Sequence, residues 1–281
     1  AGLDCEGSTP QIPVTFNSLP NPTITGNPLT VCEDNVPVTL TASGAEAPYV
    51  QYDFYLQTGT GNILVQSSTA NTFDAMMSGD YFVEVEDNNG CRDVSTAITV
   101  TIEQIPTIDA GIDQQLCNTT TANLTGTTSS GAGVWSTTST ATVDANTGAV
   151  TGMTAGSCYT FTWTVTDGVC VVADEVEVCV DEMPTVNAGT DQQICSTIAQ
   201  LQATTNVGTG QWILLSGNGA VFNALDPNTG VTNLQGGQTY QFMWMVTNGT
   251  CSANDIVEIV VDANPMNVDA GLDQDLCNQT S

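Results

Sequence analysis

The cysteines are the residues of this chain whose types and spacing could do chemistry. There are ten of them, with no histidine anywhere and no Cys-x-x-Cys pair. The missing histidine excludes Cys/His zinc sites, and the missing pair argues against an all-cysteine zinc site or a dithiol redox motif. Disulfide formation remains, which predicts an oxidising compartment outside the cytoplasm.

The chain lacks most of the side chains that serve as general bases or activated nucleophiles. General bases and activated nucleophiles usually need His, Lys or an activated Cys or Ser, and the chain has neither His nor Lys. A carboxylate pair of the glycosidase kind stays open in principle. The acidic residues, however, recur at joints and strand edges without converging on a cleft. We therefore predict that the protein is not an enzyme.

Calcium is the one ligand that the carboxylates could hold, because it favours oxygen-rich sites. The alternative is a solvated acidic edge that prevents strand-to-strand aggregation, and the sequence favours this second interpretation. The candidate calcium ligands cluster where one repeat, as defined below, would meet the next: Asp109, Asp113, Asp181, Glu182, Asp191, Asp262, Asp269 and Asp273.

The charge balance excludes two classes of partner. The chain carries 30 acidic residues and a single basic one, Arg92, for a net charge of −29. Nothing can neutralise nucleic-acid phosphates, so nucleic acid is excluded. Anionic membrane surfaces should repel the chain, and no apolar run reaches the length of a membrane span.

An internal repeat organises the sequence. An opening motif recurs as DAGIDQQLC (109–117), NAGTDQQIC (187–195) and DAGLDQDLC (269–277), with a weaker copy ending at Cys32. A closing motif recurs as YFVEVEDNNGC (81–91), YTFTWTVTDGVC (159–170) and YQFMWMVTNGTC (240–251). The period of about 80 residues fits a small β-sandwich better than a solenoid turn.

The repeats predict the domain organisation. Residues 22–105, 106–183 and 184–264 are predicted to be immunoglobulin-like repeats, named here repeat 1, repeat 2 and repeat 3. Residues 1–21 would end a preceding repeat and residues 265–281 would begin a following one. Cys5 and Cys277 would then pair with partners outside this window.

Strict alternation predicts half-buried β-strands and an all-β fold. The aromatic and apolar sets Tyr159, Phe161, Trp163, Val165 and Tyr240, Phe242, Trp244, Val246 should face the core. The last strand of each repeat alternates in the same way. Trp135 and Trp212 are predicted core tryptophans, with Phe54 in that place in repeat 1. Tyr81, Tyr159 and Tyr240 resemble the tyrosine corner of immunoglobulin-like sandwiches.

The simplest pairing keeps each disulfide inside one repeat. It joins Cys32 to Cys91, Cys117 to Cys170 and Cys195 to Cys251, with separations of 53 to 59 residues. In the chain-entropy model such loops contribute about 4 kcal/mol each.

Cys158 and Cys179 are left over, and hairpin register brings them together. Their index sum centres a turn between Gly168 and Val169 and places both on the outward face, opposite each other. A fourth disulfide within the repeat is predicted. The rival interpretation is two free thiols or bridges between chains.

These motifs resemble the PKD-like and immunoglobulin-like repeats of very large Bacteroidetes surface proteins. The resemblance rests on the opening N/D-A-G-x-D-Q-x-x-C, the central Trp and the ending G-x-x-Y-x-F-x-W-x-V-T-D/N-G-x-C. Such repeats are similar to those of gliding-motility adhesins of the SprB type, exported by the type IX secretion system. The resemblance implies a cell-surface filament that touches the substratum or other cells. Repeat 1 departs from the pattern, since it lacks A-G-x-D and the tryptophans.

The leading functional hypothesis is a secreted, non-enzymatic stalk or adhesive fibre at the cell surface, built from tandem sandwiches in an extended array. Its expected partners are the substratum, glycans or other surface proteins, and the neighbouring repeats. Two alternatives remain. One is an array of glycan- or protein-binding modules attached to an extracellular enzyme, and the other is a self-assembling sheath or filament subunit.

Overall fold

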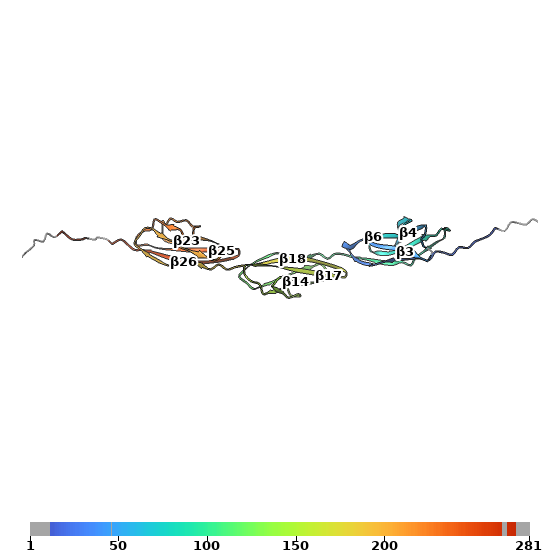
Figure 1. Cartoon of the computed structure of the whole chain (residues 1–281), viewed down its shortest axis with the longest axis horizontal. Helices are drawn as coiled ribbons and strands as arrows, with labels where there is room; N and C mark the ends of the chain where they lie inside the picture. The colour runs from blue at the N-terminus through green and yellow to red at the C-terminus, as the bar shows by residue number, and fades with distance from the viewer. Residues whose placement is uncertain (1–11, 46, 266–268, 274–281) are drawn as a thin grey trace, which may run out of the picture. The chain divides into compact units, whose positions relative to one another are not determined.

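The structure is a computed structural model that describes residues 12–45, 47–265 and 269–273 (Figure 1). The chain divides into two compact units. One comprises Ala1–Asp109, Thr127–Gly133 and Thr164–Ala173, and the other comprises Ala110–Gly126, Val134–Trp163 and Asp174–Ser281. The division passes through repeat 2, because the end of its last hairpin belongs with repeat 1. Cys5 and Cys277 lie outside the described residues.

The described chain is all-β apart from one short 3₁₀ helix, and its strand pairings stay within single repeats. Repeat 1 contains β1 (Pro22–Gly26), β2 (Thr30–Cys32), η1 (Glu33–Asn35), β3 (Val38–Gly44), β4 (Gln51–Thr58), β5 (Gly61–Ser68), β6 (Thr72–Ala75), β7 (Gly79–Glu86), β8 (Arg92–Val94) and β9 (Ile98–Glu103). No helix in the described residues is long and apolar enough to span a membrane.

Repeats 2 and 3 share a strand pattern with each other. Repeat 2 contains β10 (Ile108–Asp109), β11 (Gln114–Cys117), β12 (Thr121–Asn123), β13 (Thr127–Thr128), β14 (Ala132–Ser136), β15 (Thr142–Val143), β16 (Ala149–Thr151), β17 (Ser157–Asp167) and β18 (Cys170–Asp181). Repeat 3 contains β19 (Val186–Asn187), β20 (Gln192–Ile194), β21 (Ala199–Gln200), β22 (Thr204–Thr205), β23 (Thr209–Ser216), β24 (Gly230–Val231), β25 (Thr239–Asn248) and β26 (Cys251–Val261).

Repeat 1 is a two-sheet sandwich around one core. One sheet has the strand order β1-β3-β6, and the other has β2-β9-β7-β4-β5 with β8 beside β7. Buried side chains from both sheets meet, with Leu40 from the first and Phe54 from the second each fully buried. Phe54 therefore takes the core position predicted for it.

Repeat 3 shows why the alternating pattern forms this fold. Its main sheet has the order β20-β26-β25-β23, and Figure 1 shows β23, β25 and β26 side by side. Trp212 lies directly opposite Trp244 across β23 and β25, with ring centroids 5.1 Å apart. Every second residue of β25 is buried, from Tyr240 to Val246. The other sheets are β19-β22 and β21-β24, and Leu201 and Val231 from that side complete the core.

Repeat 2 follows the same plan, with the strand order β11-β18-β17-β14. Tyr159, Phe161 and Trp163 are buried on β17, and Trp135 lies 5.0 Å from Trp163 between ring centroids. The threonines between them are exposed or half-buried. The predicted inward and outward faces of this strand are therefore confirmed.

The predicted corner tyrosines bond to backbone a few residues upstream. Tyr81 donates its hydroxyl proton to the carbonyl of Met77 at 2.9 Å. The hydroxyl of Tyr159 accepts from the N–H of Thr154 at 2.8 Å. Burial raises the pKa of Tyr81, whereas the hydrogen bonds with Thr154 lower the pKa of Tyr159.

Candidate functional site at the joints between repeats

Two of the three disulfides among the described residues join successive repeats. The predicted pairing of Cys32 with Cys91, Cys117 with Cys170 and Cys195 with Cys251 is therefore wrong. Cys32 of repeat 1 bonds to Cys170 of repeat 2, and Cys117 of repeat 2 bonds to Cys251 of repeat 3. Cys91 and Cys195, also predicted to be bridged, are the free thiols among the described cysteines.

Strand length explains the error, as repeat 3 shows. Cys251 begins β26, and Cys195 follows β20, which pairs in parallel with the far end of β26. At about 3.4 Å per residue, the 11 residues of β26 separate those two ends by roughly 35 Å. A disulfide spans only about 4.4–6.8 Å between Cα atoms. The cysteine of the opening motif therefore cannot meet the cysteine of the closing motif in the same repeat. In repeats 1 and 2 it bonds instead to the hairpin tip of the next repeat.

Joint 1 consists of Cys32, Glu103 and the hairpin tip 167–170. The parallel register of β2 with β9 places Cys32 opposite Glu103. A carboxylate oxygen of Glu103 accepts the N–H of Val169 at 2.6 Å. Cys170 is fully buried, and its Sγ lies 3.6 Å from the Glu103 carbonyl oxygen. All of these residues belong to the first compact unit.

Joint 2 repeats this arrangement with Cys117, Asp181 and the hairpin tip 248–251. Cys117 lies opposite Asp181 in the parallel register of β11 with β18. Oδ2 of Asp181 accepts the N–H of Thr250 at 2.7 Å and its hydroxyl at 2.9 Å. The Sγ of Cys251 lies 3.5 Å from the Asp181 carbonyl oxygen. All of these residues belong to the second unit.

Glycine lets each tip approach its carboxylate. Gly168 and Gly249 have φ angles of 58° and 56°, which favour glycine, at the turn between the last two strands. A Cβ on Gly168 would overlap the Glu103 carboxylate, and a Cβ on Gly249 would overlap that of Asp181. The predicted turn residues thus also serve the joint.

Sequence analysis did not find Glu103, and it singled out Asp181 and Asp262 only as calcium candidates. A signal exists for their role as receiving acids, the carboxylates that accept hydrogen bonds at a joint. Each acid stands three residues before the proline of its joint: Glu103 before Pro106, Asp181 before Pro184 and Asp262 before Pro265. Gln115 supports the second acid by donating to Oδ1 of Asp181 at 2.7 Å.

The predicted calcium ligands are engaged elsewhere, mostly with backbone. Asp113 accepts the N–H of Glu177, and Asp191 accepts the N–H of Glu258, both at 2.8 Å. The A-G-x-D motif thus attaches the start of a repeat to its last strand. Glu182 accepts from the Asn206 side chain at 2.8 Å.

The structure does not gather the predicted calcium ligands into one cluster. Asp269 accepts the N–H of Gly271, Asp273 is exposed, and Asp109 lies in β10. Among the described residues, only Cys158, Glu177 and Cys179 group as three candidate metal ligands, and a disulfide uses both of those sulfurs. Calcium binding therefore stays the less favoured of the two interpretations of these carboxylates.

Cys158 and Cys179 form the predicted bridge within repeat 2, with Cα atoms 4.0 Å apart. The register of the equivalent hairpin in repeat 3, where Tyr240 lies opposite Ile259 and Phe242 opposite Val257, follows the same rule. This pairing is confirmed.

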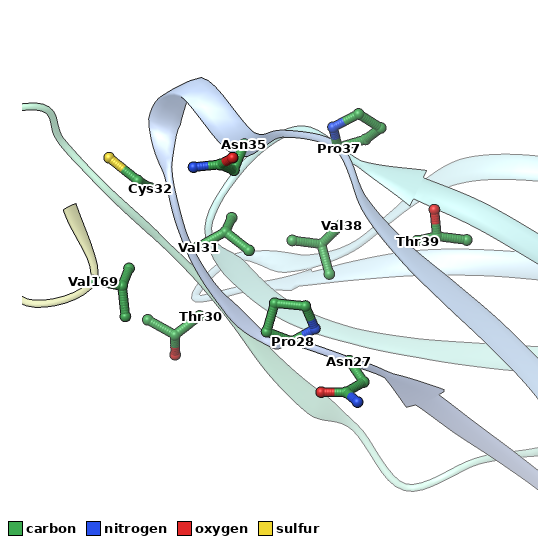
Figure 2. Close-up of a pocket in the computed structure, with 10 residues that line it drawn as sticks. All are labelled: Asn27, Pro28, Thr30, Val31, Cys32, Asn35, Pro37, Val38, Thr39 and Val169. Atoms are coloured by element: carbon green, nitrogen blue, oxygen red, sulfur yellow. The ribbon is translucent and has the colours of Figure 1, made fainter. Parts of the chain in front are cut away.

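A hollow of about 460 Å³ lies beside joint 1. Repeat 1 supplies most of its lining, including Cys32 and Pro37, and the tip of repeat 2 supplies Val169. Figure 2 shows Val169 on a separate piece of ribbon from the other labelled residues, next to Thr30. The hollow opens to solvent, and its lining carries no cluster of titratable groups. We assign it to the packing of the joint.

Comparison with known proteins gives one family match and several similar solved structures. Residues 20–103 match the family described as "Ig-like domain CHU_C associated". The chain is similar to extracellular domains 3–5 of Drosophila OTK, at 13% identity over 87% of this chain and 93% of that one, with a TM-score of 0.46. It is similar to the titin I-band fragment I67–I69, at 10% identity over 88% and 100%, with a TM-score of 0.43.

A third similar structure holds the three N-terminal domains of the bacteriophage RB49 Highly Immunogenic Outer Capsid protein. It shows 12% identity over 86% of this chain and 99% of that one, with a TM-score of 0.43. No curated protein matches the chain. The strand order and the family match together define tandem immunoglobulin-like domains, and disulfides of this number are typical of extracellular proteins.

The disulfide pattern can be checked directly. We expect peptide mapping of the unreduced protein to find Cys32 linked to Cys170 and Cys117 linked to Cys251, with Cys91 and Cys195 labelled by maleimide after denaturation. Cleavage needs chymotrypsin or a Glu-specific protease, because the chain has a single basic residue. A Cys32–Cys91 peptide would contradict the joints.

The close approach at joint 2 predicts the effect of Gly249→Ala. The added Cβ overlaps the Asp181 carboxylate, so the tip should leave its site and dithiothreitol should reduce the Cys117–Cys251 bridge faster. Gly152→Ala is the matched control, because Gly152 has a φ of 78° but open space around it. It should cost about 1–2 kcal/mol of stability through strain alone and leave the reduction rate unchanged. Equal rates in the two variants would refute the role of the approach.

Joint 2 should also weaken in acid. The N–H and then the hydroxyl of Thr250 hold the pKa of Asp181 below its ordinary value of 3.8. A lowered folded pKa gives stability above the unfolded pKa, and this is lost as pH falls through the folded value. We expect the Thr250 amide signal in NMR to titrate with a midpoint below 3.8, and Asp181→Asn to abolish the shift. A midpoint at or above 3.8 would count against the bond.

Proposed function

We propose that this chain is a non-enzymatic structural segment of a secreted cell-surface filament, in which covalently connected repeats carry load during adhesion. The substratum, glycans or other surface proteins are the proposed partners, and the resemblance to gliding-motility adhesins supports motility as the setting. The observation that carries the proposal is the pair of disulfides between successive repeats.

The two bridges create overlapping loops. Cys32–Cys170 closes a loop of 138 residues and Cys117–Cys251 one of 134. The segment from Cys117 to Cys170 belongs to both. A force entering at Cys32 crosses directly to Cys170 and bypasses most of the core of repeat 1. A passive binding module has no need of such a path, whereas a load-bearing stalk does.

The hydrogen bonds at each joint support the same role. A carboxylate, a backbone N–H and a disulfide hold each tip, and at joint 2 the Asn248 side chain also donates to the carbonyl of Glu182 at 2.8 Å. Such contacts resist rotation of a tip about its single S–S bond. The proposed joint therefore limits both stretching and swivelling.

Single-molecule stretching tests the load path. In the oxidised chain the shortest covalent route from Cys32 to Cys251 crosses only the 53 residues between Cys117 and Cys170 (170 minus 117), or about 190 Å fully extended. After reduction the route is 219 residues (251 minus 32), or about 790 Å. The oxidised chain should release roughly a quarter of the length of the reduced one.

A double variant supplies the control. With Cys32→Ser and Cys170→Ser together, the route becomes the 85 residues from Cys32 to Cys117 (117 minus 32), which should add about 115 Å. Full release of the chain without reductant would overturn the proposed function.

A further inference from the structure

At the end of repeat 3, three side chains lie in the arrangement that Cys117, Asp181 and Gln115 have at joint 2. The register of Ile194 beside Val261 continues to Cys195 beside Asp262. The Sγ of Cys195 lies 3.8 Å from Oδ2 of Asp262. Gln193 donates to Oδ1 of Asp262 at 2.9 Å.

These three side chains repeat the receiving half of joint 2, which consists of Cys117, Asp181 and Gln115. Gln115 donates to Asp181 as Gln193 does to Asp262. The two sites differ in solvent exposure and in bonding. Cys117 is half-buried and disulfide-bonded, whereas Cys195 is exposed and free. The cysteine and the acid of joints 1 and 2 each hold a tip. At the end of repeat 3 the three groups of joint 2 recur around an exposed cysteine.

We infer that Cys195, Asp262 and Gln193 form a docking site for the hairpin tip of a repeat that follows repeat 3 in the same polypeptide. In both occupied joints the tip comes from the next repeat along the chain. Residues 269–277 repeat the opening motif after Pro265, as 187–195 do after Pro184. The inference does not depend on the load-bearing role.

The occupied joints define the chemistry of the tip. Both tips have the sequence Gly-x-Cys, as Gly168-Val169-Cys170 and Gly249-Thr250-Cys251. The glycine admits the carboxylate, the N–H of the middle residue donates to it, and the cysteine forms the bridge. Asp262 should accept the same middle N–H from its partner.

The tip of repeat 1 does not match this description. Gly90 stands directly before Cys91, and its N–H donates to the Asp87 carbonyl at 3.1 Å. Oδ1 of Asp87 accepts the N–H groups of Asn89 and Cys91, both at 2.8 Å. The backbone N–H groups of this tip therefore already donate to Asp87 of the same tip. This argues against a second copy of the chain docking through Cys91.

The bond forms by thiol–disulfide exchange with a small disulfide oxidant. One thiolate attacks the oxidant and releases one reduced thiol, and the second thiolate attacks the mixed disulfide and releases the other. Cys195 and the tip cysteine together lose two protons and two electrons. The oxidant, such as oxidised glutathione, gains both as two thiols.

A tandem insertion tests the site in the full chain. A second copy of residues 184–264, inserted after residue 264, supplies a Gly-x-Cys tip at the natural spacing. In a glutathione redox buffer, peptide mapping should find Cys195 linked to the copied Cys251. The intramolecular link should form on the order of 10²-fold faster than any link between separate chains at micromolar concentration.

The controls separate docking from random oxidation. Asp262→Asn should slow the link, and Cys251→Ser in the copy should leave Cys195 open to maleimide. Residues 106–183 inserted at the same point provide a second Gly-x-Cys tip, should the first insertion fail to fold. A free Cys195 in both folded insertions, an unchanged rate with Asp262→Asn, or equally fast Cys195–Cys91 links between chains would overturn the inference.

Discussion

The joints depend on the last strand of each repeat, which keeps its two ends far apart. In repeat 3 the hairpin tip begins β26, and the strand before the first cysteine pairs in parallel with the other end of β26. A cysteine at one end can bond only to whatever is presented there. The hairpin tip of the next repeat lies at that end, so the disulfide connects successive repeats covalently. In repeat 3, β26 thus contributes buried side chains to the core and also carries a joint residue at its start.

The acids at these joints are hydrogen-bonded without any basic side chain. The single arginine pairs with Asp53, Glu84 and Glu86 within repeat 1, so it is not available to the joint acids. Glu103, Asp181 and Asp262 instead accept from backbone N–H, hydroxyl and amide groups. Hydrogen bonds of this kind give a carboxylate its partners without a cation. A chain of net charge −29 can therefore hold its joints together without lysine.

The sequence predicted the interior well and the connections poorly. Alternation placed Tyr159 to Trp163 and Tyr240 to Val246 in the cores, because a period of two is a local property of a strand. Hairpin register found Cys158–Cys179 for the same reason. The other bridges were missed because spacing along the chain ignores strand direction. Cys117 and Cys170 are close in sequence, yet parallel pairing of β11 places Cys117 beside Asp181, at the end of the strand that Cys170 begins.

The overlapping loops also determine whether a single proteolytic cut separates the chain into two fragments. A cut between Cys32 and Cys117 leaves the fragments joined through Cys32–Cys170, and a cut between Cys170 and Cys251 leaves them joined through Cys117–Cys251. Within the shared stretch both bridges span the break. One hydrolysed peptide bond anywhere from Cys32 to Cys251 therefore does not divide the molecule, and the fragments would separate only once the disulfides were reduced.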